Sequence, residues 1–519
     1  MRSLLPDTTR RRGRGIHFFS LIVLGAVFAG FPGVGPGAVP LAAQSAGTDY
    51  PRAPREFRGV WVTTLKNLDW PSRPGLSAER QREELVAILD RAVELNLNAV
   101  ILQVRSMGEA LYASENAPWS HFLSGEMGRP PGPAYDPLEF AIQEARRRGL
   151  ELHAWLNPYR VHHEIGTDEV SSGHISRTHP QLVRRYGSLL WLDPSEPEVR
   201  RHILAVVREI VRNYDVDGIH IDDYFYPWPQ AGRPFPDDAN WERYRRGGGD
   251  LSRADWRRRH VNELIHGLYA EVKRENPRVK VGVSPFGIWR PNHPAGITGS
   301  DQYEMLYADP RLWLRRGWLD YIAPQLYWST AQEQQSFPRL LAWWHAQNTR
   351  DRHVWPGLAT WKVTEADWSA NEIVNQIETA RRQGGTAGHI HFRHTWLHEN
   401  RAEIATTLRS RAYPSPALVP ASPWLGDEAP ARPKARLGEG ASEAERVVRF
   451  ESPETDEVRL WALYTRHRDG WHFRQILPAY RRHTGAVRIP AAERGVSHVA
   501  ITAVDRLGNE SDPAVVRVR

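Results

Sequence analysis

The chain of 519 residues contains no cysteine. This absence excludes disulfide bonds, a thiol nucleophile, Cys-ligated zinc and iron–sulfur clusters. No Gly-rich phosphate-binding loop is present either. Tryptophan, in contrast, is abundant, with 21 residues against 14 phenylalanines. Amphipathic rings of this kind suit a surface that handles carbohydrate, and they also fill large cores.

The excess of positive charge is small once the N-terminus is set apart. The formal net charge is +7, and residues 1–43 supply +4 of it through five arginines and one aspartate, which leaves +3. A charge of this size gives no indication of nucleic-acid binding. With 41% hydrophobic and 25% charged residues, the composition is that of a globular protein rather than a disordered one.

The N-terminal segment is typical of a secretory signal. Residues 10–14 are basic, residues 18–29 are apolar, and residues 41–43 end in two alanines. These features are the charged region, the hydrophobic region and the cleavage site of a signal peptide. The apolar run is short for a membrane span, and a retained N-terminal anchor is the alternative. We therefore expect a secreted or periplasmic protein that meets the membrane only transiently, through this segment.

Short apolar segments alternate with helical patterns between residues 55 and 412. The strand candidates are 58–64, 98–105, 150–157, 217–223, 279–285, 320–327, 353–359 and 386–393. The helical patterns are 77–95, a helix that begins at 136, 196–213, 253–275, 309–316, 332–347, 371–383 and 400–410. This alternation places the segment in the α/β class and predicts a (β/α)8 TIM barrel as the catalytic domain. A doubly wound open sheet is the alternative.

The C-terminal part has a different pattern. Prolines at 414, 416, 420, 423, 430 and 433 predict a stiff linker over residues 413–434. Residues 435–519 contain short strand-like runs with a hairpin turn signal at Asp469-Gly470. We predict a small all-β sandwich for this region, and residues 497–511 resemble the penultimate strand and turn of fibronectin type III domains.

Alternation along the strand candidates predicts which side chains point into the barrel. If the apolar residues of each strand pack against helices, polar residues point inwards on most strands. Barrel enzymes place their chemistry at the C-terminal ends of the strands, so the last inward residues should surround the site. A buried structural network is the alternative, and His389, deep on its strand, is predicted to be a core histidine. The inward polar residues are Gln103, Arg105, His153, Trp155, Asn157, His220, Asp222, Ser284, Gln325, Tyr327, His389, His391 and Arg393.

Asp222 and Asp223 are the predicted catalytic residues. Asp222 would point inwards at the end of the fourth strand, where a carboxylate can stabilise a sugar oxocarbenium ion. Glycoside hydrolysis also needs a carboxylic acid, and the candidates besides Asp223 are Glu109, Glu304 and Asp309. Asp309 precedes a proline and also fits a helix N-cap. The predicted sugar-binding residues are Arg105, His153, Asn157, Tyr159, His220, Tyr224, Gln325, Tyr327, Trp328, His391 and Arg393.

The same residues fit other reaction types less well than glycoside hydrolysis, and we predict no cofactor and no metal. His389, His391 and His394 with Asp222 would suit a metal-dependent polysaccharide deacetylase, but the first strand offers no His-x-His. Ser284 lacks the Gly-x-Ser-x-Gly turn of a serine nucleophile. A non-catalytic protein that binds cell-wall glycan is the remaining alternative.

Five motifs in order resemble the glycosyl-hydrolase-like family ten, formerly a domain of unknown function, which includes divisome-localised glycosyl hydrolases. They lie at residues 57–62, 102–105, 151–160, 217–227 and 317–328. The resemblance covers about residues 55–412. It implies a bacterial extracytoplasmic hydrolase whose partner is peptidoglycan glycan strands stripped of their stem peptides, or a related polysaccharide.

The fourth strand also resembles the Asp-Gly-x-x-x-Asp of α-amylase-type barrels, in which the last aspartate, here Asp222, is the nucleophile. His220 stands where that pattern has arginine, and the glutamate expected on the fifth strand is absent. The resemblance therefore leaves a retaining mechanism and α-glucan specificity open.

Overall fold

The computed structural model describes residues 52–162, 170–365, 368–384, 387–439, 446–453, 458–480, 484–490, 493 and 495–518. The predicted signal segment, residues 1–43, lies outside them. Within the described ranges, no helix has both the length and the apolar character that a membrane span requires.

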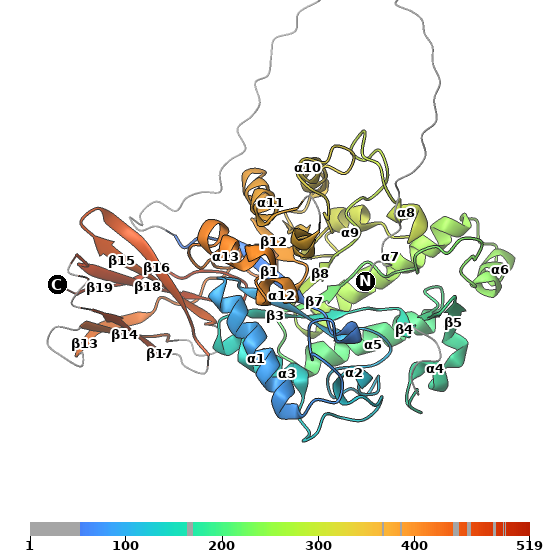
Figure 1. Ribbon diagram of the computed structural model, residues 1–519, viewed down its shortest axis with the longest axis horizontal. Helices are drawn as coiled ribbons and strands as arrows, with labels where there is room; N and C mark the ends of the chain where they lie inside the picture. Colours follow the sequence, from blue (N-terminus) through green and yellow to red (C-terminus); the bar gives the residue numbers. More distant parts are fainter. Residues whose placement is uncertain are drawn as a thin grey trace, which may run out of the picture. The chain divides into compact units, whose positions relative to one another are not determined.

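A curled parallel sheet lies at the centre of the fold (Figure 1). In the described part of the chain it has nine strands, in the order β10-β9-β8-β7-β3-β2-β1-β12-β11. Only Trp355 and Pro356 separate β10 from β11, and this stretch pairs with β9 on one side and with β12 on the other. The strands are β1 (Phe57–Val62), β2 (Ala99–Arg105), β3 (Glu151–Leu156), β7 (Gly218–Ile221), β8 (Lys280–Val283), β9 (Tyr321–Ile322), β10 (His353–Val354), β11 (Gly357–Leu358) and β12 (Gly388–His391).

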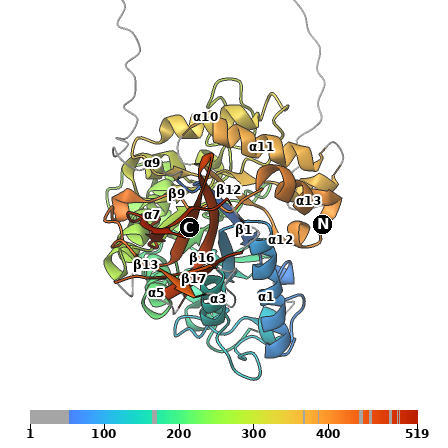
Figure 2. The ribbon, with the colours of Figure 1, turned by 90° about the vertical axis from the view of Figure 1, so that its left-hand side faces the viewer.

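Among the described residues, seven helices that alternate with the strands form a ring around them (Figure 2). Ser77 caps the first by accepting from the N–H of Arg80 at 3.2 Å, and Asp136 caps the second, which opens with a proline. The predicted α/β alternation around a parallel sheet is thus confirmed. The helices are α1 (Ala78–Glu94), α3 (Pro137–Arg147), α5 (Pro197–Asn213), α7 (Arg253–Glu275), α9 (Pro310–Arg316), α10 (Phe337–Gln347) and α11 (Ala370–Arg382).

Further elements occupy the connections, and the periodicity does not predict most of them. The helix over Ile404–Thr407 lies within the predicted helix 400–410. A small antiparallel sheet, in the order β4-β6-β5, follows the third strand of the curled sheet. It comprises β4 (Arg160–His162), β5 (Val183–Tyr186) and β6 (Leu189–Leu192). The short helices are α2 (His121–Ser124), α4 (Ile175–Thr178), α6 (Asp238–Arg246), α8 (Gln302–Met305), α12 (His394–His398) and α13 (Ile404–Thr407).

The C-terminal part is all-β, as predicted. Phe450, Trp461 and Ile501, from two different sheets, belong to one buried cluster. The predicted hairpin is present, with His467 paired to Gly470. The likeness to fibronectin type III stays a prediction. One sheet contains β13 (Lys434–Glu439), β14 (Arg446–Glu451) and β17 (Thr484–Ile489), and the other contains β16 (Gly470–Pro478), β15 (Leu460–His467), β18 (His498–Val504) and β19 (Ala514–Arg517).

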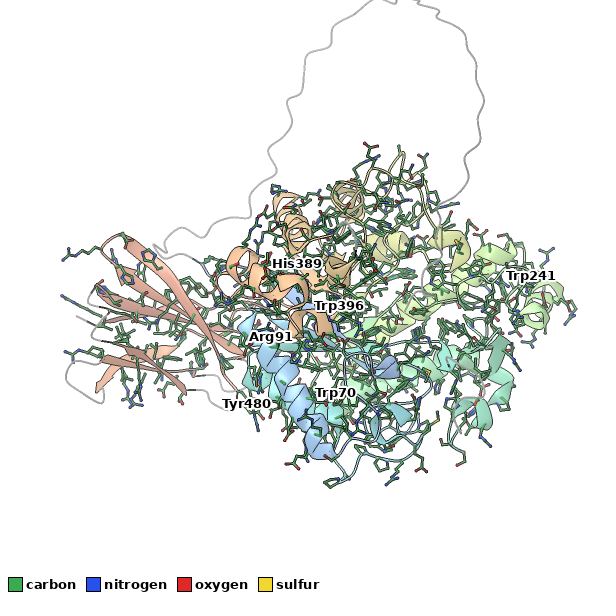
Figure 3. The ribbon with its side chains drawn as sticks, in the orientation of Figure 1. Trp70, Arg91, Trp241, His389, Trp396 and Tyr480 are labelled. Carbon is green, nitrogen blue, oxygen red and sulfur yellow. The ribbon has the colours of Figure 1, made fainter. Side chains whose placement is uncertain are left out.

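The predicted inward face is wrong on one strand, β12. Ile390 packs inside the curled sheet, whereas His389 (labelled in Figure 3) and His391 both contact the Tyr413 hydroxyl in the outer core. The reason is steric, because a Cβ at Gly388 would lie 2.4 Å from the Trp355 indole inside the sheet. His389 is the core histidine that the sequence predicts.

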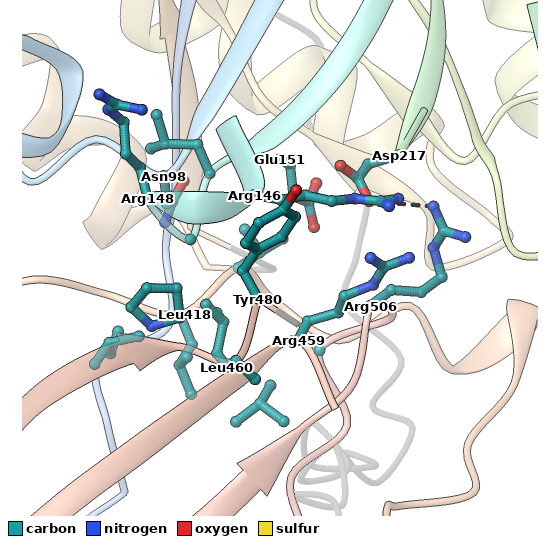
Figure 4. Close-up of a pocket in the computed structure, with 18 of the residues that line it drawn as sticks. Asn98, Arg146, Arg148, Glu151, Asp217, Leu418, Arg459, Leu460, Tyr480 and Arg506 are labelled. Atoms are coloured by element: carbon teal, nitrogen blue, oxygen red, sulfur yellow. Dashed lines mark hydrogen bonds and ion pairs between the residues drawn. The ribbon is translucent and has the colours of Figure 1, made fainter. Parts of the chain in front are cut away.

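The N-terminal ends of the strands contact residues from the C-terminal part. Trp424, in the predicted linker, donates from its indole N–H to Asp320 at 2.8 Å, and Arg506 contacts Asp217 at 3.2 Å. A cavity of about 690 Å³ lies at this end. Figure 4 shows Asp217 and Glu151, from the beginnings of strands, together with Arg459 and Arg506 in its wall. The predicted catalytic residues follow the opposite ends of the same strands.

Candidate active site

Asp222 and Asp223 follow β7 directly and are buried, with 4% and 8% of their surface exposed. The Asp222 carboxyl accepts a hydrogen bond from the Trp155 indole N–H at 3.1 Å and from the Asn157 amide at 3.2 and 3.3 Å. Both donors come from the end of β3, which pairs with β7 in parallel. The neighbouring strand therefore fixes the position of this carboxyl.

Burial makes both carboxyls weaker acids than an ordinary aspartate. It raises the pKa of Asp222 to about 7, and the neighbouring Asp223 adds to the increase, while Arg160, Trp155 and Asn157 oppose it. Burial likewise raises the pKa of Asp223 to about 6, against a hydrogen bond from Gln325 and the charge of Arg160. Near neutral pH the pair can thus hold one proton, so that one acid and one carboxylate lie together.

Arg160, which the site prediction omits, is a cation whose charge lowers the pKa of both Asp222 and Asp223. Its backbone N–H donates to the Asn157 side chain at 2.9 Å. Its guanidinium lies 4.1 Å from the centre of the Tyr224 ring. The position was available from the sequence, because Trp155, Asn157 and Arg160 all fall in the predicted motif at 151–160.

Half-buried aromatic rings lie beside the pair. The Trp228 and Phe286 rings are 5.5 Å apart, and the Phe286 and Trp328 rings are 5.6 Å apart. Burial raises the pKa of both Tyr224 and Tyr327, and the charge of the nearby Asp223 raises it further. Rings that are partly exposed can stack on the apolar faces of sugars. We call this set the aromatic rim: Tyr224, Trp228, Phe286, Tyr327 and Trp328.

Gln325 connects the pair to the end of the fifth predicted strand, residues 279–285. Its amide donates to the Ser284 carbonyl at 2.9 Å, and it also hydrogen-bonds Asp223. Of the predicted sugar-binding residues, Asn157, Tyr224, Gln325, Tyr327 and Trp328 therefore lie at the pair or in the aromatic rim.

Two other predicted sugar-binding residues lie deeper than predicted. His153 and His220 point into the curled sheet, but neither has any exposed surface. All four of their ring nitrogens contact protein groups. The predicted alternative of a buried network describes these two residues.

His391 and Tyr159 also differ from the prediction. His391 lies on the outer face of β12, between Thr360 and Tyr413 at 2.8 Å from each. Tyr159 packs in the outer core with 1% exposure, since the chain turns at Pro158 into β4.

The two predicted arginines support neighbouring backbone. Arg105 donates to the Asn157 carbonyl at 2.9 Å. Arg393 pairs with Asp69 at 2.6 Å and donates to the Leu68 carbonyl at 2.6 Å, which ties the loop after β1 to the end of β12. Both side chains are almost fully buried.

The three further acid candidates are engaged elsewhere. Glu109 is fully buried and accepts from Ser120 and from His121. Asp309 is the N-cap of α9, which is the role that its proline neighbour suggests. Glu304 is exposed and pairs with arginines of α7 and of a nearby loop. Asp222 and Asp223, which are neighbours in the sequence, are thus the candidate carboxyls that lie together.

The metal alternative gains no support from the described residues, where no group of three or more His, Asp or Glu side chains is arranged to hold an ion. His389 and His391 face away from Asp222, on the other side of β12.

Comparison with known proteins gives consistent matches. The family model Glycosyl hydrolase-like 10 matches residues 56–374. Glycosyl hydrolase YngK of Bacillus subtilis (strain 168) is 37% identical over 474 residues, which cover 88% of this chain and 92% of YngK. Glycosyl hydrolase DigH of Escherichia coli (strain K12) is 36% identical over 387 residues, which cover 68% of this chain and 87% of DigH.

Among solved structures, the PgaB (BpsB) glycoside hydrolase domain from Bordetella bronchiseptica aligns with a TM-score of 0.46 and 16% identity, over 69% of this chain and 99% of that one. The family match and the two relatives confirm the resemblance that the five motifs predict. The chain therefore belongs to the glycosyl hydrolase-like 10 family and is an enzyme of the glycoside hydrolase class.

Proposed function

We propose that this enzyme, secreted or periplasmic, hydrolyses the glycosidic bonds of peptide-free peptidoglycan glycan strands with Asp222 and Asp223. The observation that carries the proposal is the pair of adjacent buried carboxyls with raised pKa values, about 7 and about 6, next to the aromatic rim. Two carboxyls in unequal environments supply the acid and the carboxylate that glycoside hydrolysis requires.

The chemistry follows from these protonation states. The protonated carboxyl gives its proton to the glycosidic oxygen as the bond to the anomeric carbon breaks. The ionised carboxyl stabilises the positive charge that develops on that carbon. Water then supplies the hydroxyl of the new reducing end and gives its other proton to the carboxyl that acted as the acid, which restores the pair. Arg160 keeps the pKa values of the pair from rising further, so that one carboxylate persists near neutral pH.

The choice of substrate rests on the surroundings of the pair and on the sequence. A glycan strand without stem peptides presents the faces of its sugar rings, acetamido groups and lactyl carboxylates. The aromatic rim suits the ring faces, and the partly exposed Gln325 amide beside Asp223 suits the polar groups. The secretory signal predicted at residues 1–43 would deliver the enzyme to such a polymer.

The test is digestion of amidase-stripped and intact peptidoglycan by the purified chain, with products identified by mass spectrometry. Two variants accompany it: Asp222→Asn, and the matched control Glu83→Gln, which removes an exposed carboxyl on α1. New reducing ends from stripped strands, absent with Asp222→Asn and retained with Glu83→Gln, are the expected result.

Other products would overturn the proposal in different ways. Anhydro ends would indicate a lytic transglycosylase. Release of acetate that stops on chelation would indicate a deacetylase. Binding to the strands without any cleavage would indicate a glycan-binding role.

A further inference from the structure

A continuous series of hydrogen bonds crosses the inside of the curled sheet. The Glu151 carboxyl lies 3.0 Å from His153 Nε2. His153 Nδ1 lies 2.8 Å from the Tyr321 hydroxyl, which lies 2.9 Å from His220 Nδ1. His220 Nε2 lies 2.9 Å from the Ser284 hydroxyl. The two imidazoles and the phenol are fully buried, so that the position of each proton is decided by these contacts alone.

Trp61 fixes the direction of the series at one end. Its indole nitrogen, which can only donate, lies 3.2 Å from His220 Nε2. His220 Nε2 therefore carries no proton, and its Nδ1 does. The Ser284 hydroxyl, at 2.9 Å from the same Nε2, is then the second donor to its single lone pair, which it shares with the indole. Burial keeps the pKa of His220 well below its usual value, which agrees with a neutral ring.

The other end gives the same direction. The Tyr321 oxygen accepts from His220 Nδ1 and must give its own proton to His153 Nδ1. His153 Nε2 then donates to Glu151, whose second oxygen lies 2.5 Å from the Lys280 ammonium. A doubly protonated His153 would leave the Tyr321 hydroxyl proton without an acceptor in the series. Each proton thus has one place in which every contact is satisfied.

The strands leave space for these rings. A Cβ at Gly282 would lie 1.9 Å from the Tyr321 ring, and one at Gly218 would lie 2.6 Å from His153 Nδ1. Gly282 on β8 and Gly218 on β7 both point inwards, and these two strands are neighbours in the sheet. A side chain at either position would displace a member of the series.

The series ends beside the catalytic pair. Ile221 pairs with Val283 in register, so Ser284 and Asp222 follow on neighbouring strands, and the Ser284 N–H donates to the Ile221 carbonyl at 2.9 Å. The Ser284 carbonyl accepts from Gln325, which also bonds Asp223.

We propose that Tyr321 is a positioning residue that, together with Trp61, holds His220 in its Nδ1–H tautomer and thereby makes the Ser284 hydroxyl a hydrogen-bond acceptor toward the substrate. Ser284 has given its only proton to His220, so its remaining lone pair would accept from a hydroxyl or acetamido N–H of the sugar beside Asp222. The role in catalysis rests on the proposed function, whereas the tautomer does not.

Tyr321→Phe removes both hydrogen bonds of the hydroxyl and keeps the ring. The His220 Nδ1–H would then be buried without an acceptor, whereas an Nε2–H would face the Trp61 N–H, so each tautomer would leave one donor unsatisfied and both would be populated. The Nε2–H tautomer donates to Ser284 and turns the serine proton toward the substrate, where an acceptor is needed. We expect kcat/KM on stripped strands to fall by about tenfold or more, as for other unsatisfied buried groups.

The experiment combines 15N NMR of labelled histidine with kinetics. The His220 signals are assigned by their absence in His220→Gln. We expect a protonated Nδ1 and an unprotonated Nε2 in the wild type, and a mixture of the two tautomers in Tyr321→Phe. The control is Tyr269→Phe on α7. It removes a hydroxyl that donates a hydrogen bond to Asp320, and it should change neither the His220 tautomer nor the rate.

Ser284→Ala is the second variant, and it should lose as much activity as Tyr321→Phe while the His220 tautomer stays unchanged. A protonated Nε2 in the wild type would overturn the proposal even if Tyr321→Phe failed to fold. Full activity in Ser284→Ala would overturn it as well. Absence of hydrolysis by the wild type would instead refute the proposed function, and the tautomer would still be measured.

Discussion

Asn157 donates from its amide to both carboxyl oxygens of Asp222, at 3.2 and 3.3 Å, and its own side-chain oxygen accepts from the backbone of Arg160 at 2.9 Å. One side chain thus joins the carboxyl to the segment that carries the nearby cation. The indole of Trp155 reaches the same carboxyl from two residues earlier. The end of β3 therefore fixes the position of Asp222 and opposes the increase in its pKa that burial causes.

Replacement of Arg160 should move the pH dependence of activity. Activity of the wild type should decline below about 6, where the carboxylate is lost, and above about 7, where the acid is lost. The guanidinium lowers both pKa values, so Arg160→Gln should shift both limbs of kcat/KM to higher pH. Arg200→Gln, which breaks a pair with Glu263 between α5 and α7, is the control. Limbs that stay in place or move down would contradict the electrostatic role of Arg160.

Ionisation of Asp222 should also be visible in stability. Its pKa is about 7 in the folded protein against 3.8 as the ordinary value. Its contribution to stability is therefore complete below pH 3.8 and is lost as the pH rises toward 7. Asp222→Asn cannot ionise, so the variant should gain on the wild type by about 1.4 kcal/mol per pH unit over this range. Urea unfolding of both proteins from pH 4 to 8 measures the difference, and parallel curves would refute the raised pKa.

Local sequence patterns predict the elements that depend on neighbours in the chain. Ser77 and Asp136 cap helices where an N-cap residue precedes an amphipathic run. Alternation places His153, His220 and Ser284 inside the curled sheet because each lies between two apolar residues that pack outwards. Helix α7 has the same bounds in the prediction and in the structure.

Contacts between distant segments do not follow from such patterns. On β12, two histidines alternate with an isoleucine and a phenylalanine, and the pattern predicts the apolar residues outside. The choice is made by Trp355 and Phe57, which fill the inside next to Gly388, and by Tyr413, which satisfies both histidines from the outside. The pairing of Arg393 with Asp69, more than 300 residues apart, is likewise beyond any local pattern.

Loss of a ring from the aromatic rim should weaken substrate binding. Trp328 is half-buried and packs edge-to-face on Phe286, so its exposed part is available for a sugar face. Trp328→Ala should raise KM by roughly tenfold, since aromatic contacts contribute about 0.5–1.5 kcal/mol beyond their buried area, with a smaller change in kcat. The control is Trp241→Ala on α6, whose ring contacts those of Tyr244 and Trp256 (Figure 3). An unchanged KM would remove Trp328 from the binding surface.

The junction with the C-terminal part should matter for stability but not for catalysis. Arg506 contacts Asp217 at 3.2 Å and Asp215 at 2.9 Å. Its loss removes a hydrogen bond and the largest of three arginine charges that act on the buried Asp217 carboxyl, the others being Arg459 and Arg146. Arg506→Met should therefore lower the unfolding free energy by about 3 kcal/mol. Arg474→Met, which breaks a more exposed pair with Glu493, should lower it by less than about 1 kcal/mol.

The kinetic half of this prediction depends on where the contacts lie. Asp217 precedes β7 and Asp222 follows it, so the pair and the junction stand at opposite ends of one strand. Below its unfolding temperature, Arg506→Met should keep the wild-type kcat/KM on stripped strands. A folded variant with reduced kcat/KM would show that the C-terminal part acts on the site through the strand or through Lys280, whose ammonium lies 2.5 Å from Glu151 and 3.5 Å from the Arg506 carbonyl. In that case the hydrogen-bond series from Glu151 to Ser284 would be the route to examine, and Tyr321→Phe should abolish the effect of the Arg506 substitution.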